Sequence, residues 1–497
     1  MTTEMKNYYE QNIEKEMINY VCGDDEELRQ ILLASDSLNK RARILAQLQE
    51  MNQNRSRLFN DIIKITAENK VGATKHIRSV VKMLRDYVEF GDVEVKTMGE
   101  VMTPIELVEK MLRKLPAHVW SDKNLKWLDP CNGVGIFVSV IVDRLMKGLS
   151  VAIPNEEERY KHIMEKMIYV GELQPKNMFL FLYAFDPHDK YALNIHCGSY
   201  LTEDFNVRMN EYGVDKFDVI VMNPPYQSLQ EGNTKSQALW NLFVKKALNV
   251  SLKEDGYLVA VHPSGWRNVD GMFKDVQMQL KSRQMSYLEI HNEKDGLKTF
   301  GAETRYDFYC VKNTENLGNF ETEIMCQDGT VELADLSKME FIPNGMYDTF
   351  QKLIAKNGEE TVKIINNSSY HHQRSHMNKI QTEEFKYPCV YTVKNGDVLT
   401  LWYSNINTKG HFGIPKLIWS SGRIISVGSY VDKTGEYGLT EFGSAIVDDV
   451  NVLDKIKQAF DTKEFRALME ACSVSDMSIN RKVIATFRKD FWKEFLY

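Results

Sequence analysis

The chain has 497 residues, so it is long enough for more than one domain, and its formal net charge of −7 excludes a strongly basic protein. A nucleic-acid partner needs only a local basic face, so the total charge does not exclude one. The longest apolar runs, such as residues 257–261, are too short to cross a bilayer, and the start MTTEMKNYYEQN is no secretory signal. The seven cysteines form no CxxC pair, which argues for a reducing compartment and against structural zinc. We therefore expect a cytoplasmic protein without a metal ion or a membrane partner.

Residues 1–95 are predicted to form a helical N-terminal segment. Apolar residues recur there at three- and four-residue steps, as in Leu28, Ile31 and Leu32. Six Lys and Arg side chains fall between residues 64 and 85, and they form either a solvated helix face or a contact to a DNA backbone. The group Asp86, Glu94 and Lys96 has a faint nuclease-like pattern, which we interpret as coincidence.

From residue 125 onward, short apolar strands alternate with helices. Strands are expected at residues 125–128, 168–171, 192–196, 217–222, 257–262, 287–291 and 306–311, and helices at 136–145, 176–184, 237–248 and 272–280. This alternation predicts an α/β fold with a mostly parallel, doubly wound sheet of seven strands. Ligands of such sheets bind beyond the carboxyl ends of the strands.

The alternation ends near residue 313, which predicts a separate, mixed α+β C-terminal domain. The pairs Asp328-Gly329 and Asn395-Gly396 predict β-hairpins. A strand-like run follows at 416–431, and helices are expected at 451–460 and 484–495. The predicted domains are residues 1–95, 96–315 and 316–497.

The most specific motif is Asn223-Pro224-Pro225-Tyr226, directly after the apolar strand FDVIVM. The nitrogen of a flat exocyclic amine, such as N6 of adenine, is a poor nucleophile because its lone pair is delocalised into the ring. The Asn223 side-chain oxygen and the Pro224 carbonyl can accept both hydrogens of such an amine, and Tyr226 offers a face for stacking. A rigid turn that merely closes the strand is the plain alternative.

A second motif, Asp129-Pro130-Cys131-Asn132-Gly133-Val134-Gly135, joins the first predicted strand to its helix. Its glycines permit a tight turn and close approach of a ligand to the backbone. The motif has neither the spacing of a dinucleotide-binding turn nor the ending of a P-loop. Glu172 ends the next strand, where a carboxylate either accepts ribose hydroxyls or only caps the chain.

These motifs, in this order, resemble the γ-type amino-methyltransferases of DNA, over residues 96–311. The stretch Gly99-Glu100-Val101-Met102-Thr103-Pro104 is similar to the first motif of that family, and Asn at position 223 is typical of adenine-N6 rather than cytosine-N4 enzymes. The resemblance implies a Rossmann-like, seven-stranded class I methyltransferase core that uses S-adenosylmethionine, followed by a C-terminal target-recognition domain.

The resemblance also implies roles for individual residues. The predicted catalytic residues are Asn223, Pro224, Pro225 and Tyr226. The predicted cofactor-binding residues are Thr103, Pro104, Asp129, Pro130, Asn132, Gly133, Gly135, Glu172, Ser199 and Asn223, with Leu242 or Phe243 near the cofactor's adenine. Ser199 departs from the family, which usually has Asp there, so either Ser199 serves, or Asp204 substitutes, or cofactor affinity is lower.

The implied reaction is methyl transfer to N6 of an adenine flipped out of double-stranded DNA at a specific sequence. A restriction endonuclease partner is a candidate, and the sequence leaves the oligomeric state open. The alternatives are methylation of RNA adenine, a bifunctional restriction-modification enzyme, methylation of a protein glutamine, and a DNA-binding protein without catalysis.

Two weaker groups lie in the C-terminal domain. The polar segment with His371, His372, Gln373, Arg374 and His376 is a mobile surface loop, a DNA-contacting loop or, against the usual ligand spacings, a metal site. Trp419, Arg423, Tyr430 and Lys433 are predicted on strands that can face a DNA groove.

Overall fold

The computed structural model describes residues 102–186, 190–229, 236–269, 271–366, 368–422, 424, 427–474 and 479–496. The predicted helical N-terminal segment, its basic stretch and the nuclease-like group therefore lie outside the described residues. The chain divides into two compact units. The described part of the first unit covers residues 102–263 and 275–324, and the second unit comprises Ser264–Lys274 and Met325–Tyr497. The predicted division at residues 95/96 and 315/316 stays a prediction.

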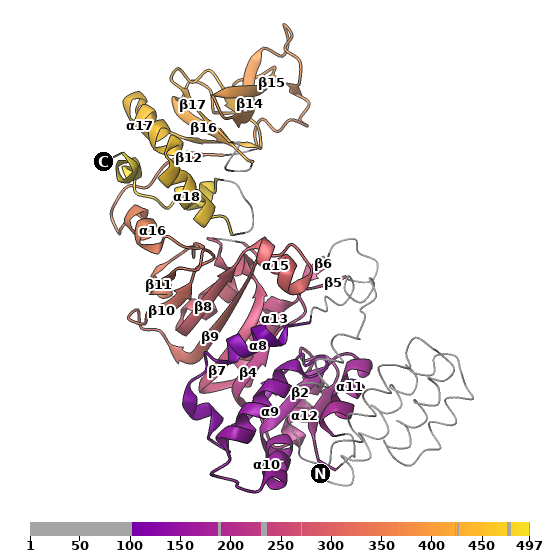
Figure 1. Ribbon diagram of the computed structural model, residues 1–497. Helices are drawn as coiled ribbons and strands as arrows, with labels where there is room; N and C mark the ends of the chain where they lie inside the picture. Colours follow the sequence, from indigo (N-terminus) through magenta and orange to yellow (C-terminus); the bar gives the residue numbers. More distant parts are fainter. Residues whose placement is uncertain are drawn as a thin grey trace, which may run out of the picture. The chain divides into compact units, whose positions relative to one another are not determined.

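Most of a large sheet lies in the first unit, although β11 belongs to the second unit; the sheet has the strand order β11-β10-β8-β9-β7-β4-β1-β2-β3 (Figure 1). Its strands are β1 (Trp127–Asp129), β2 (Ile168–Glu172), β3 (Asn194–Cys197), β4 (Phe217–Met222), β7 (Leu252–Pro263), β8 (Arg283–His291), β9 (Tyr306–Glu315), β10 (Thr322–Met325) and β11 (Val331–Ala334). Strands β3, β2, β1, β4 and β7 pair in parallel, whereas β9 is antiparallel to both β7 and β8. The predicted α/β fold with a mostly parallel sheet is confirmed.

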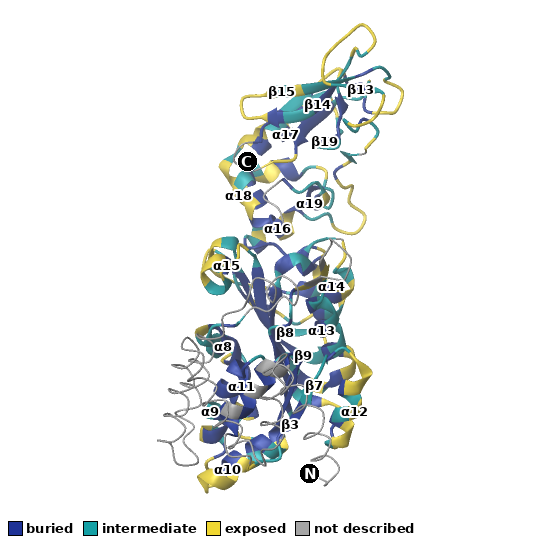
Figure 2. Cartoon of the chain, turned by 90° about the vertical axis from the view of Figure 1, so that its right-hand side faces the viewer, coloured by how far each residue is buried: buried dark blue, intermediate teal, exposed yellow. Residues whose placement is uncertain are grey.

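Helices cover this sheet, and they come from the segments between its strands. They are α8 (Ile105–Leu112), α9 (Ile136–Gly148), α10 (Glu156–His162), α11 (Pro175–Phe185), α12 (Glu203–Glu211), α13 (Trp240–Lys246), α14 (Lys274–Lys281) and α15 (Glu293–Phe300). Helix α8 contacts β7 and β9, α11 contacts β2, and α12 contacts β3. The strands are buried, while α10 and α12 carry exposed residues (Figure 2). Burial on both faces explains why the strands read as continuous apolar runs.

All seven predicted strands are present, but among the described residues the sheet has nine. The turn Asp328-Gly329, assigned from the sequence to a separate domain, joins β10 to β11, and these two strands extend the large sheet. Gly329 has a φ of 86°, which is the left-handed conformation that such a turn needs. The turn itself was therefore predicted. The pairing of β10 with β8 depends on tertiary packing, which no local sequence pattern encodes.

The second unit has two four-stranded sheets and a set of short helices. One sheet has the order β12-β19-β16-β17 and the other β13-β15-β14-β18. The strands are β12 (Ile364–Ile365), β13 (Met377–Asn378), β14 (Tyr387–Lys394), β15 (Val398–Ser404), β16 (Lys416–Ser420), β17 (Ser429–Asp432), β18 (Gly438–Leu439) and β19 (Gly443–Ile446). The helices are α16 (Tyr347–Leu353), α17 (Val450–Asp461), α18 (Lys463–Ala471) and α19 (Arg481–Ile484).

The expected hairpin at Asn395-Gly396 is confirmed, since β14 and β15 pair antiparallel on either side of it. The run at 416–431 is not one strand but the antiparallel pair β16 and β17. The predicted helix at 451–460 is α17, whereas 484–495 is mostly irregular and ends in a 3₁₀ turn at Phe491–Phe495. Among the described residues, no helix is both long and apolar enough to cross a membrane.

Candidate active site

Three polar side chains meet at the carboxyl edge of the sheet in the first unit. Asp129 is the last residue of β1, Glu172 is the last of β2, and Asn223 directly follows β4. Because β1 lies between β2 and β4 and is parallel to both, the three strands end at the same edge. This is the edge at which open α/β sheets bind their ligands.

The turn between β1 and α9 depends on two glycines in the left-handed conformation. Gly133 has a φ of 56° and Gly135 a φ of 93°, and α9 begins at the next residue. A Cβ atom on Gly135 would lie 2.6 Å from the Phe185 ring, whereas one on Gly133 would have no neighbour within 4 Å. Gly135 therefore serves packing, and Gly133 leaves open space beside the backbone.

Glu172 ties this turn to the end of β2. One carboxylate oxygen accepts the Gly133 amide at 2.7 Å, and the other accepts the Gln174 amide at 2.8 Å and the Asn177 side-chain amide at 3.4 Å. Burial raises the pKa of Glu172, and the hydrogen bonds from Gln174 and Gly133 offset part of that rise. A carboxylate has about four acceptor positions, so the Gly133-bound oxygen retains capacity for a further donor. Glu172 is thus a structural anchor as well as a candidate ligand.

Asp129 is buried, with only 2% of its surface exposed. Its Oδ1 accepts the Cys131 amide at 3.2 Å, while its Oδ2 has no hydrogen-bond partner among the described residues. Burial raises the pKa of Asp129 to about 8; the Cys131 amide lowers it, and the charge of Glu172 raises it further. Two buried carboxyl groups side by side favour a ligand that brings positive charge or hydrogen-bond donors.

Asn223 is held from two sides. Its side-chain amide donates to the Thr103 hydroxyl at 2.9 Å, and its backbone carbonyl accepts from the Cys131 thiol at 3.3 Å. Thr103 is buried just ahead of α8. The structure therefore brings the motif after β4 together with the Thr-Pro motif and the β1 turn, each of which lies more than 90 residues before it in the chain. Neither contact could be read from the sequence.

Tyr226 lies beside aromatic residues from a later part of the first unit. Its ring meets Phe300 edge to face at 6.2 Å, and Phe300 meets Tyr306 at 4.8 Å. The Tyr226 hydroxyl has no hydrogen-bond partner among the described residues, and burial raises the pKa of this phenol well above its usual range. The phenol of Tyr226 is therefore neutral, and the role of its ring stays a prediction. Phe300, at the end of α15, is a site residue that the sequence did not reveal.

Ser199 stabilises the turn after β3, since its hydroxyl accepts the Leu201 amide at 3.2 Å. Asp204, the proposed substitute, is exposed in the first turn of α12. Phe243 on α13 packs against Tyr200 at 5.3 Å. The role of each in holding a cofactor stays a prediction.

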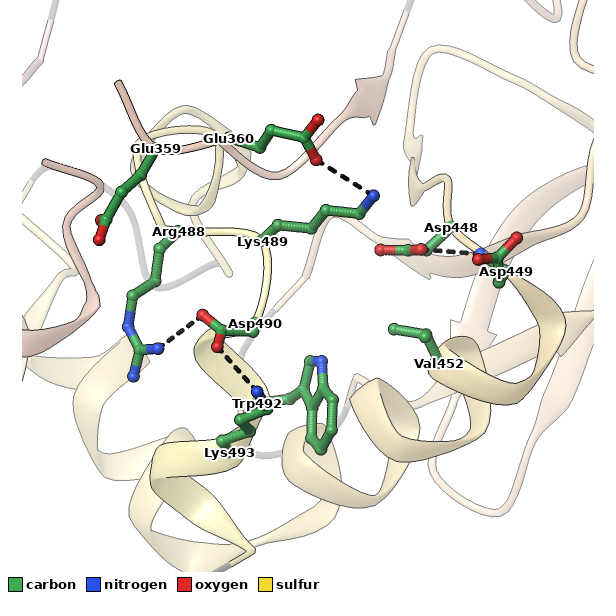
Figure 3. Close-up of a pocket in the computed structure, with 10 residues that line it drawn as sticks. All are labelled: Glu359, Glu360, Asp448, Asp449, Val452, Arg488, Lys489, Asp490, Trp492 and Lys493. Carbon is green, nitrogen blue, oxygen red and sulfur yellow. Dashed lines mark hydrogen bonds and ion pairs between the residues drawn. The ribbon is translucent and has the colours of Figure 1, made fainter. Parts of the chain in front are cut away.

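A pocket of about 390 Å³ lies in the second unit (Figure 3). It is lined by Glu359, Glu360, Asp448, Asp449, Val452, Arg488, Lys489, Asp490, Trp492 and Lys493. All three of its basic side chains are paired with acidic ones, as in Lys489 with Glu360 at 3.3 Å and Lys493 with Asp490 at 3.0 Å. None of these residues belongs to the predicted site.

The structure corrects the groove-facing prediction for Trp419, whereas for Tyr430 and Lys433 it stays a prediction. Trp419 is 1% exposed in β16, and its indole nitrogen donates to the Ile479 carbonyl, so it is a core residue. Lys433 pairs with Asp454, and Tyr430 packs on Tyr437. Arg423 lies outside the described residues.

Comparison with known proteins matches the centre of the chain. Residues 154–295 match the family described as Eco57I restriction-modification methylase. An "uncharacterized adenine-specific methylase" of Mycoplasma pneumoniae is 28% identical, over 37% of this chain and 60% of that protein. The predicted family resemblance is confirmed. The match to this family supports S-adenosylmethionine as the cofactor.

These matches are partial. The chain spans about 60% of the length of the curated methylase. Among solved structures, a complex of DrdV with DNA has a TM-score of 0.48 at 13% identity and covers 91% of this chain and 62% of that one. The type IIL restriction-modification enzyme MmeI in complex with DNA has the same TM-score at 11% identity, covering 84% and 70%. At these TM-scores, neither likeness establishes a shared fold.

Proposed function

We propose that this chain is an S-adenosylmethionine-dependent methyltransferase that acts on N6 of adenine in specific sequences of double-stranded DNA. The observation that carries the proposal is the Asn223 side chain, which directly follows β4 and is oriented by the Thr103 hydroxyl beside the β1 turn. The family match over residues 154–295 supports the same reaction class.

The roles follow from the hydrogen bonds of the site. The Asn223 nitrogen donates to Thr103, and the side-chain oxygen is the acceptor of the same amide. This oxygen and the Pro224 carbonyl accept the two N6 hydrogens and thereby favour a tetrahedral nitrogen. Pro225 restricts the backbone of this motif. The face of Tyr226, supported by Phe300, stacks on the base. The proton leaves after transfer, so no general base is assigned.

The β1 turn fits the cofactor. The buried oxygens Asp129 Oδ2 and Asn132 Oδ1 have no hydrogen-bond partners among the described residues, and Gly133 leaves space beside its backbone. S-Adenosylmethionine supplies an electrophilic methyl group on a positively charged sulfur. Asp129 and Glu172 provide hydrogen-bond acceptors on the protein side, while Thr103, Pro104, Pro130, Gly135 and Ser199 complete the predicted set.

A base inside a duplex cannot reach such a site, so the adenine is proposed to be flipped out of the helix. The C-terminal residues are proposed to recognise the target sequence, and a separate restriction endonuclease is the expected companion. The solved structures of DrdV and MmeI are complexes with DNA, and a DNA substrate is proposed for this chain on the family match.

The deciding experiment measures transfer of label from methyl-labelled S-adenosylmethionine to unmethylated genomic DNA, with RNA and protein alongside. Label recovered as N6-methyladenine in DNA is expected. Asn223→Ala should lower the rate by at least about 10²-fold, because it removes an acceptor aimed at the reacting nitrogen. Asn210→Ala, at an exposed Asn on α12, is the matched control and should leave the rate unchanged.

Two outcomes would contradict the proposal. Label in RNA or protein but not in DNA would assign a different substrate to the same chemistry. Measurable binding of S-adenosylmethionine without transfer to any of these substrates would indicate a binding protein without catalysis.

A further inference from the structure

A cluster of metal-binding side chains lies in the second unit, apart from the proposed active-site residues. It consists of His371, His372 and Glu441, and one ligand atom from each lies within 4.8 Å of the other two. All three residues are half-buried. Two imidazoles and one carboxylate are a common ligand set for zinc, which accepts nitrogen and oxygen donors at one site.

The three groups converge because one carboxylate faces both rings. The backbone amide of His372 donates to Glu441 Oε2 at 3.0 Å, and the ring Nδ1 of the same residue contacts Oε1. His371 Nε2 lies 3.9 Å from that same Oε1. The two imidazoles stack at 5.0 Å with an angle of 14° between their planes. One ring nitrogen of each histidine therefore lies close to the Glu441 carboxylate, within 4.8 Å of the other ligand atoms.

Aromatic side chains fix the orientation of the His372 ring. Trp402 of β15 meets it at 5.2 Å, Tyr391 of β14 at 5.8 Å, and Phe442 at 6.1 Å. An apolar surround that holds the ligands in place is a feature of metal sites, because it reduces both ligand motion and solvent access.

We propose that His371, His372 and Glu441 bind one zinc ion, with water as the fourth ligand. The ion links the turn around residues 368–376 to the segment that follows β18, and so stabilises the second unit. Nδ1 of His371 accepts the Gln373 amide at 3.3 Å, so ligation through Nε2 requires this long contact to break. The expectation that the chain holds no metal rested on sequence spacing, and Glu441 lies 69 residues beyond His372.

The test uses the full chain, with any affinity tag removed and metals stripped by a chelator. Titration with zinc chloride in a calorimeter should show one saturable site. His372→Gln and Glu441→Gln should each weaken zinc binding by more than about tenfold, since each removes a ligand. His376→Gln is the matched control, because this histidine lies in the same turn but bonds to the Ser369 carbonyl; it should bind zinc as the wild type does.

Two further readouts separate a metal site from a structural effect. The metal-free Glu441→Gln chain should melt close to the metal-free wild type yet lose the rise in melting temperature that zinc produces. Co²⁺ bound to the wild type should show no thiolate charge-transfer band. That readout needs no variant, so it decides the question even where a substitution prevents folding. A thiolate band, no saturable binding by the wild type, or wild-type affinity in both ligand variants would overturn the proposal.

Discussion

The hydrogen bond between Asn223 and Thr103 determines which end of the Asn223 amide faces the reacting base. An unconstrained amide can present either its oxygen or its nitrogen, and only the oxygen accepts hydrogens from an amine. The Thr103 hydroxyl accepts from the nitrogen at 2.9 Å, which favours the amide orientation in which the oxygen faces the substrate. On the proposed function, Thr103 is a positioning residue for Asn223 as well as a cofactor contact.

Thr103→Val keeps the shape of the side chain and removes the hydroxyl. We expect kcat for methyl transfer to fall by about 10- to 100-fold, because the Asn223 amide loses the partner that orients it. Thr103→Ser should retain most of the rate. Single-turnover kinetics at saturating S-adenosylmethionine separate this effect from cofactor affinity. Equal rates for the Val and Ser variants would contradict the orienting role.

Asp129 makes stability depend on pH. Its pKa rises from 3.8 to about 8 on burial, so the folded chain holds a proton that the unfolded chain releases between these values. This contribution to stability is fully present below pH 4 and is lost as the pH rises to about 8. Asp129→Asn should therefore gain free energy of unfolding over the wild type as the pH rises, by at least about 1 kcal/mol between pH 5 and 8.

Chemical unfolding at several pH values measures this difference. Asp204→Asn, which removes an exposed carboxylate on α12, should show no comparable trend. A difference between Asp129→Asn and the wild type that stays constant with pH would mean that Asp129 is ionised throughout.

At the level of elements, the turn into α9 is where backbone conformation and packing act together. Gly135→Ala places a methyl group in the left-handed region and 2.6 Å from the Phe185 ring. We expect a loss of about 2–4 kcal/mol of stability, from strain and overpacking combined. Gly213→Ala has a φ of 76° with no neighbour within 4 Å, so it should lose only about 1 kcal/mol. Denaturant unfolding compares the two, and equal losses would show that Phe185 yields without cost.

The sequence predicted the elements of the first unit well because its strands are buried on both faces and bounded by turn residues. Strand β4 has its predicted limits, 217–222. The helix expected at 237–248 was predicted to begin too early, because α13 begins at Trp240. Residues 236–238 instead form β6, which pairs with β5 (Gln227–Leu229). Apolar periodicity does not distinguish a short strand from the first turn of a helix.

Only those residues of the candidate site that belong to sequence motifs could be predicted. Asp129, Glu172 and Asn223 follow strands, so the topology of a parallel sheet brings them to one edge. The contacts of Asn223 with Thr103 and Cys131 depend on side-chain packing across distant segments, and Phe300 stands in no motif. Trp419 was predicted to face a DNA groove and is a core residue instead. An aromatic residue on a strand gives the same sequence signal whether it faces solvent or the core.

At the scale of the whole molecule, two compact units with separate cores predict unfolding in more than one step. S-Adenosylmethionine should raise the melting temperature of one transition, because its proposed ligands lie in the first unit. Zinc should raise that of the other, because His371, His372 and Glu441 lie in the second. Differential scanning calorimetry with each ligand alone measures both shifts. A single transition that both ligands raise equally would mean that the units unfold together.

The short segment Ser264–Lys274 has a consequence for attempts to exchange recognition modules between related enzymes. It belongs to the second unit although the first unit resumes directly after it. Arg267 within it is fully buried and donates to the Ile342 carbonyl and the Asn344 side chain, and Ser264 donates to the Val474 carbonyl. A graft made by one cut near residue 325 would therefore carry away the acceptors and leave their donors behind. A chimaera that transplants both pieces together keeps these polar groups satisfied, so module exchange in this chain requires three junctions rather than one.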